Sequence, residues 1–133
     1  MNHAELQGAI IEIASLLGWD LKYHTHDSRH SAAGFPDLVL IHMGKRRVVW
    51  IEFKVPPDKI SPEQTAWHDG LAICDQEVYI VWPEHLEEVK VILTLGHKPN
   101  LLERMKFECA VVYNPTIPNN YAHIVEKFKE RME

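Results

Sequence analysis

The sequence predicts an α/β domain in which a mixed central sheet is flanked by helices, and three observations lead to that prediction. Residues 38–41 and 48–53 are short runs rich in Val, Ile, Leu and aromatic residues, which is typical of strands. Helical patterns precede and follow this pair, over residues 3–18 and from residue 61 onward. A further apolar run at residues 78–82 follows the second helix. This helix has the length expected of a crossover between parallel strands, and such a crossover should be right-handed.

The first two apolar runs predict a hairpin whose register follows from its centre. A two-residue loop at residues 44–45 and a longer loop over residues 43–46 have the same centre. Either loop places Asp37 opposite Glu52, with about 5 Å between the Cβ atoms. Lys54 lies two residues beyond Glu52 and therefore on the same face. The three charged side chains are thus expected to converge at one end of the hairpin.

Asp37 and Glu52 are then two opposed carboxylates among apolar neighbours. Strands that are apolar on both faces are covered on both sides, so the pair is expected to be half-buried. Two such carboxylates repel each other, and a hard divalent cation is the natural ligand to hold them together. A Glu-x-Lys triplet alone is common and usually supplies solvated charges at a strand end. It is the facing Asp that favours a site.

Composition and charge indicate a single domain. The 133-residue chain holds 14 Lys and Arg and 19 Asp and Glu, a net charge of −5, and the acidic excess falls within residues 61–95. This balance neither supports nor excludes a DNA ligand. No run approaches the roughly 20 apolar residues of a membrane span, and no signal-peptide pattern is present. Two well-separated cysteines suggest no disulfide framework, so a reduced, cytoplasmic protein is the expectation.

The N-terminal segment, residues 3–18, predicts an amphipathic helix that Gly18 closes. Glu5 and Glu12 are seven residues apart, so they share one face of this helix. Carboxylates in such positions are usually solvated, and this is the preferred interpretation of Glu12. A short strand over residues 19–25 follows. The apolar stripe of the helix consists of Leu6, Ile10, Ile13 and Leu17.

His24, His26 and His30 lie close together in the sequence. His24 and His26 are two residues apart, so they would share a face of a strand. Zinc binds imidazole, but no Cys lies near and the spacing matches no strong zinc signature. An exposed loop with solvated side chains is an alternative interpretation for His30.

The second helix has a well-defined start. Ser61 is the expected N-cap, Pro62 occupies the first helical position, and Gln64 completes a capping box. The helix is expected to run to about Cys74. Its inward-facing residues are predicted to be Ala66, Trp67, Leu71 and Cys74.

The remaining elements are expected in a C-terminal extension and its approach. A helix is predicted over residues 83–95, and residues 1–95 are interpreted as the core. Residues 96–133 are interpreted as an extension packed on the same single domain. This extension is predicted to contain a helical turn at residues 99–105, a strand-like segment at 109–113, a linker at 114–120 and an amphipathic helix at 121–132.

The residues around the hairpin resemble a known family of nucleases. Pro36-Asp37, fourteen intervening residues and then Glu52-Phe53-Lys54 form the pattern of the PD-(D/E)xK nucleases. The flanking segments HDSRHSAAGFPDLVLI, IEFK and SPEQTAWHDGL resemble the VRR-NUC (virus-type replication-repair nuclease) branch, over about residues 3–92. The resemblance implies a restriction-endonuclease-like core.

The resemblance also implies roles for individual residues. Asp37, Glu52, the backbone carbonyl of Phe53 and, by resemblance alone, Glu5 are expected to bind one or two Mg²⁺ or Mn²⁺ ions. Lys54 is expected to position the attacking water or to neutralise a phosphate. Gln64 is expected near the active site, an interpretation that competes with its capping role. The expected nucleic-acid contacts are His26, Arg29 and Lys59.

The function that follows is a divalent-metal-dependent, structure-specific DNA endonuclease. Its expected substrate is branched DNA such as Holliday junctions, and its expected state is a homodimer in the cytoplasm of a bacterial cell or phage-infected host. The alternative is a non-catalytic nucleic-acid-binding or assembly module with the same fold. The intact Asp37, Glu52 and Lys54 count against that alternative, because a binding module has no need of two repelling carboxylates.

Overall fold

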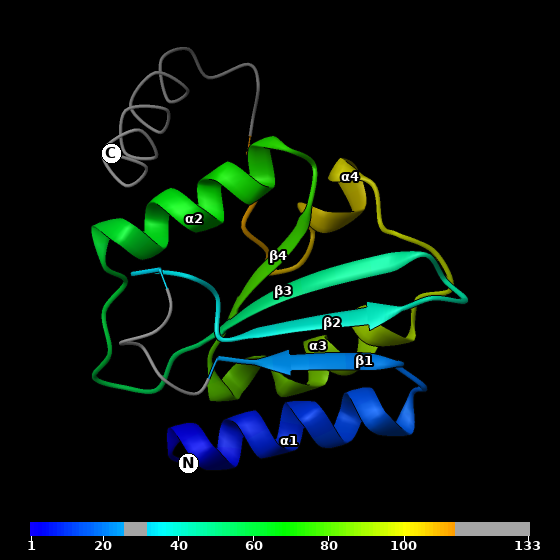
Figure 1. Cartoon of the computed structure of the whole chain (residues 1–133), viewed down its shortest axis with the longest axis horizontal. Helices are drawn as coiled ribbons and strands as arrows, with labels where there is room; N and C mark the ends of the chain where they lie inside the picture. Colours follow the sequence, from blue (N-terminus) through cyan, green and yellow to red (C-terminus); the bar gives the residue numbers. More distant parts are fainter. Residues whose placement is uncertain (26–31, 114–133) are drawn as a thin grey trace.

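A computed structural model describes residues 1–25 and 32–113 of the chain. Its centre is a four-stranded sheet in the order β1-β2-β3-β4, with helices on both faces (Figure 1). The predicted α/β class with a mixed, helix-flanked sheet is confirmed, and it is consistent with a restriction-endonuclease-like core. In chain order the elements are α1 (His3–Leu16), β1 (Leu21–His24), β2 (Leu38–His42), β3 (Arg47–Phe53), α2 (Pro62–Ile73), β4 (Glu77–Val81), the 3-10 turn η1 (Pro83–His85), α3 (Leu86–Thr94) and α4 (Leu101–Arg104).

The sheet has the predicted register. Strands β2 and β3 are antiparallel with Leu38 opposite Ile51, which is the pairing that the centre of the hairpin requires. The turn between them is the longer of the two predicted loops, since β2 ends at His42 and β3 begins at Arg47. Strand β4 pairs with β3 in parallel, after the α2 crossover. Strand β1 pairs antiparallel with β2 and leaves its other edge unpaired in the described sheet.

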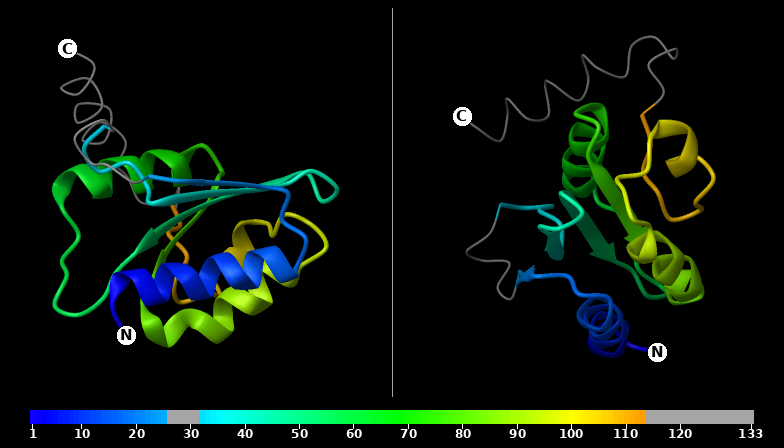
Figure 2. Two further views of the ribbon diagram at one scale, coloured as in Figure 1. Left: turned by 60° about the horizontal axis from the view of Figure 1, so that its bottom comes forward. Right: turned by 90° about the vertical axis from the view of Figure 1, so that its right-hand side faces the viewer.

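One face of the sheet carries the main hydrophobic core. Alternate residues of β2 and β3 point to this face, as the pleat of a strand requires. They are buried against α1 and α3, which lie together on that side (Figure 2). Helix α1 ends at Leu16, two residues before the predicted end, and Gly18 follows with a φ of +80°. The buried cluster includes Leu6, Ile10, Leu38, Leu40, Val49, Ile51, Phe53, Val89 and Ile92.

The opposite face of the sheet packs against α2. The predicted capping box is present, because Ser61 Oγ accepts from the Gln64 backbone N–H and the Gln64 side chain accepts from the Ser61 N–H. The prediction of the inward face was partly wrong: Cys74 is exposed at the C-cap, whereas His68 is buried. The reason is that apolar residue type guided the prediction, whereas His68 turns inward toward the Glu52 carboxylate on this side of the sheet.

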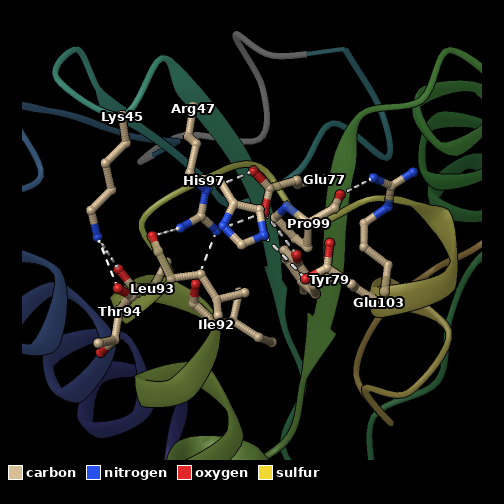
Figure 3. A network of polar contacts seen from close by, with 12 residues as sticks. Lys45, Arg47, Glu77, Tyr79, Ile92, Leu93, Thr94, His97, Pro99 and Glu103 are labelled. Atoms are coloured by element: carbon tan, nitrogen blue, oxygen red, sulfur yellow. Dashed lines mark hydrogen bonds and ion pairs between the residues drawn. The ribbon is translucent and has the colours of Figure 1, made fainter.

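A charged network lies in the core between β3, β4 and the end of α3 (Figure 3). The Arg47 guanidinium donates to both Glu77 oxygens, at 3.0 and 2.7 Å, and also to the Ile92 and Leu95 carbonyls. Tyr79 donates to Glu77 Oε1 at 2.9 Å. Both charged side chains are fully buried and paired, which is the arrangement that buried charges require.

The segment after α3 packs on the outer side of β4. The Ile80 N–H donates to the Cys109 carbonyl at 2.8 Å, and Ala110 forms an isolated antiparallel bridge with Tyr79. The strand-like segment predicted at 109–113 is therefore a single bridge and not a strand. The predicted linker at 114–120 and helix at 121–132 lie outside the described residues.

Candidate active site

Asp37 and Glu52 lie together on the α2 face of the sheet. Leu38 pairs with Ile51, and Asp37 and Glu52 occupy the next position toward that end of the hairpin. The register therefore brings them side by side. Asp37 Oδ2 accepts a hydrogen bond from the Phe53 N–H at 2.8 Å, which fixes its carboxyl group across the two strands.

Gly34 positions the segment that leads into Asp37. Its φ is +83°, and a Cβ there would lie 2.3 Å from the Glu63 carbonyl carbon. Only glycine allows the backbone to approach the start of α2 this closely. The contact therefore holds Asp37 next to the first turn of the helix that carries Gln64.

The two carboxyl groups strongly perturb each other. Burial and the neighbouring Glu52 raise the pKa of Asp37 to about 7. Burial also raises the pKa of Glu52, whose residue is only 3 % exposed. Near neutral pH the pair is therefore partly protonated, whereas isolated carboxyl groups would be ionised. Perturbed, coupled carboxyl groups of this kind are typical of sites that bind a cation or act in catalysis.

Lys54 and Gln64 complete a polar cluster around Glu52. Lys54 Nζ lies 4.0 Å from Glu52 Oε2 and donates to Gln64 Oε1 at 2.8 Å and to the Lys59 carbonyl at 2.9 Å. Gln64 Nε2 donates to Glu52 Oε2 at 3.0 Å. The two interpretations of Gln64 are therefore compatible, because its oxygen caps the helix while its nitrogen binds Glu52.

His68 belongs to the same cluster, although the sequence did not single it out. It lies four residues after Gln64, so both side chains are on the face of α2 that looks toward Glu52. Its Nε2 atom is 3.7 Å from Glu52 Oε1. Burial lowers the pKa of His68 to about 4, so the ring is neutral at physiological pH. The spacing of four from Gln64 was the signal that could have identified it.

Glu5 lies at the same end of the sheet but is not part of the cluster. The start of α1 reaches the loop after Lys54, where His3 Nε2 pairs with Asp58 Oδ2 at 2.6 Å. The Glu5 side chain is exposed and accepts from the Asn2 N–H at 3.0 Å in a capping box. To join Asp37 it would have to leave this contact, and its role as a metal ligand stays a prediction.

The predicted nucleic-acid contacts are only partly described. Lys59 is exposed in the loop between β3 and α2, and its carbonyl holds Lys54. His26 and Arg29 lie outside the described residues, as does His30. His24 Nδ1 lies 3.4 Å from Gln7 Nε2.

The donor set of the cluster fits a hard divalent cation. Glu52 Oε1 is buried and has no hydrogen-bond partner in the described part of the chain, so it is available to a ligand. Within residues 1–25 and 32–113, no three His, Cys, Asp or Glu side chains are close enough to form a metal cage. Mg²⁺, however, typically takes one or two carboxylates and keeps several waters. Asp37 and Glu52 are sufficient for that mode of binding.

In the described part of the chain, every helix is too short or too polar to cross a membrane.

Comparison with known proteins identifies the family. The model of the VRR-NUC domain matches residues 9–82, a segment that starts after Glu5 and includes the whole Asp37–His68 cluster. Searches among curated proteins and among solved structures gave no match. The match covers more than half of the 133 residues. The matched segment contains the β2–β3 hairpin and helix α2, which carry the polar cluster just described. The chain therefore belongs to the VRR-NUC domain family.

Proposed function

We propose that the protein is a divalent-metal-dependent, structure-specific DNA endonuclease that hydrolyses phosphodiester bonds. The observation that carries the proposal is the pair of half-buried Asp37 and buried Glu52, with Lys54 beside it on one face of the sheet. Membership of the VRR-NUC family supports the nuclease class. The proposed cofactor is Mg²⁺ or Mn²⁺, since oxygen donors suit these hard cations.

Each residue of the cluster has a proposed task. Asp37, Glu52 and the backbone carbonyl of Phe53 would hold the cation, with Glu5 as a further ligand once its side chain leaves Asn2. The cation, when bound, activates water and stabilises the negative charge that develops on the phosphate. Lys54 is held by Gln64 Oε1 and the Lys59 carbonyl, so its ammonium group is fixed beside Glu52. There it can orient the water or contact a phosphate oxygen.

The proposed substrate is branched DNA such as a Holliday junction, cut by a homodimer. A two-fold dimer sets two active sites in a fixed relation, and a four-way junction has the matching symmetry. An open apolar surface on β1 is compatible with pairing of two copies, since Leu21 and Tyr23 are 53 % and 61 % exposed there. The dimer should show about twice the 15.4 kDa chain mass by light scattering.

The decisive experiment is a cleavage assay on linear duplex, flap, splayed-arm and four-way DNA. We expect cleavage with Mg²⁺ or Mn²⁺, none with EDTA, and a preference for the branched substrates. Asp37→Ala should fold but not cut. If a verified, folded Asp37→Ala protein cuts at the wild-type rate, the site is wrongly assigned. A strict monomer that cuts linear duplex as fast as a junction would leave a general metal-dependent nuclease instead.

The assay also separates the alternative of a non-catalytic nucleic-acid-binding module. Such a module would bind DNA without cutting any substrate, and binding would be insensitive to loss of the Asp37 carboxylate.

A further inference from the structure

His68 is a buried polar side chain that makes no hydrogen bond to the residues that the structure describes. The residue is 1 % exposed, and within the described part of the chain neither ring nitrogen makes a hydrogen bond. A buried polar group left unsatisfied is destabilising, so an apolar residue would serve a packing role better at this position. The imidazole therefore calls for an explanation beyond packing.

The atom that faces His68 is equally unsatisfied. Glu52 Oε2 accepts from Gln64 Nε2 at 3.0 Å. Glu52 Oε1 lies 3.7 Å from His68 Nε2 and has no hydrogen bond within residues 1–25 and 32–113. Gln64 and His68 are one helical turn apart on α2, so each faces one oxygen of the same carboxylate. A movement of less than 1 Å would bring the His68–Glu52 pair to the usual distance of about 2.9 Å.

We propose that His68 is a positioning residue for Glu52, donating a hydrogen bond from Nε2–H to Glu52 Oε1 while Gln64 holds Oε2. The inference rests on the proposed function, because the carboxylate so oriented is a proposed cation ligand. Gln64 and His68 together fix the plane of the carboxylate between α2 and the sheet.

Neutral donors are suited to this task. A carboxylate oxygen has two lone pairs, so one hydrogen bond at each oxygen leaves one lone pair for a cation. Gln64 is a neutral amide, and the proposed His68 donor is the N–H group of a neutral imidazole. They orient Glu52 without cancelling the negative charge that attracts the cation. Donors to metal-binding carboxylates act in this way generally, and their loss typically costs about 10- to 100-fold in metal affinity.

The test compares three variants of His68 by calorimetry with Mn²⁺ in the absence of DNA. His68→Gln places an amide nitrogen near the Nε2 position, whereas His68→Asn places it near Nδ1 and His68→Phe has no donor. We expect the Mn²⁺ affinity of the Phe and Asn variants to fall about 10- to 100-fold. The Gln variant should recover most of it. The matched control is His42→Gln at the far end of β2, which should leave Mn²⁺ affinity unchanged.

A second measurement reports the tautomer directly. Nitrogen-15 NMR of the metal-free protein should show His68 with the proton on Nε2, and this pattern should persist when Mg²⁺ is added. A proton on Nδ1 would turn the Nε2 lone pair toward Glu52 and overturn the proposal.

The outcomes distinguish the positioning role from the proposed function. Equal Mn²⁺ affinity in wild type and all three variants overturns the positioning role and leaves the nuclease proposal standing. Mn²⁺ binding that depends on His68 as expected, in a protein that cuts no DNA, supports positioning and removes the nuclease function. A wild-type protein that binds no Mn²⁺ overturns both. If His68→Phe does not fold, the Gln and Asn variants still decide, since both are polar and differ only in where the donor lies.

Discussion

Replacing Asp37 by Asn should make the metal-free protein more stable at neutral and alkaline pH. The asparagine has the same shape and still accepts the hydrogen bond from the Phe53 N–H, but it cannot ionise. In the wild-type protein, ionisation of Asp37 places a second negative charge beside Glu52 in a largely buried site. The variant avoids that repulsion.

The size and the sign of the effect follow from the pKa of Asp37. That pKa rises from 3.8 to about 7 on folding, so the folded protein binds the proton more tightly than the unfolded chain does. The contribution of Asp37 to the free energy of unfolding is therefore fully present below about pH 4, and it is lost progressively as the pH rises to about 7. A shift of this size corresponds to at most about 4 kcal/mol at about 1.36 kcal/mol per pKa unit. Because Asp37 is partly exposed, screening by solvent reduces the expected loss to about 2 kcal/mol.

The assay is thermal unfolding of wild type and Asp37→Asn at pH 4 and pH 8, with EDTA present. The two proteins should have similar midpoints at pH 4, and the variant should be higher by about 8 °C at pH 8, at about 4 °C per kcal/mol. Addition of Mn²⁺ at pH 8 should raise the midpoint of the wild type and not that of the variant. A variant that is destabilised equally at both pH values would refute the reasoning, because the carboxyl group would then have a structural role independent of its charge.

Three other predictions concern the surroundings of the site. Glu5→Gln should weaken Mn²⁺ binding or turnover whereas Glu12→Gln should not, and the reverse result in calorimetry would show that the wrong carboxylate of α1 was assigned. Lys54→Ala should reduce cleavage by about 100-fold or more while calorimetry shows Mn²⁺ still bound, so lost metal binding would contradict its assignment to water or phosphate. Gly34→Ala should lower the free energy of unfolding by at least about 2 kcal/mol in urea titrations, through its positive φ and the clash with α2, and unchanged stability would mean that the close approach is absent in solution.

Much of the fold was predictable because local rules agreed with one another. The centre of the hairpin turn required Asp37 opposite Glu52, and the structure has that register. The capping residues at Ser61 likewise marked the start of α2. The ends of α1 and β1 were predicted less well, because the turn around Gly18 depends on where Trp19 enters the core.

The parts of the candidate site that escaped prediction depend on how α2 is rotated against the sheet. The pattern of apolar residues in α2 predicted that Cys74 faces inward. In the structure Cys74 is exposed, and His68 faces Glu52. The rotation is set by contacts between elements distant in sequence, such as Gln64 with Glu52, and no periodicity within the helix reveals it. The same holds for Arg47 and Glu77, which are 30 residues apart and meet only through the parallel register of β3 and β4.

That buried ion pair has a consequence for the opposite end of the strands. Arg47 and Glu77 are the first residues of β3 and β4. Their bidentate contact therefore fixes the register of the two strands relative to each other. A slip of one residue would turn one charge out of the core and leave the other unpaired, at a cost of about 3–5 kcal/mol. Glu52 comes five residues after Arg47, an odd number, and therefore faces away from the core toward α2. The ion pair thus fixes the strand register at one end of the sheet. As a result, the carboxylate of Glu52, and not the side chain of Ile51 or Phe53, faces α2 at the other end.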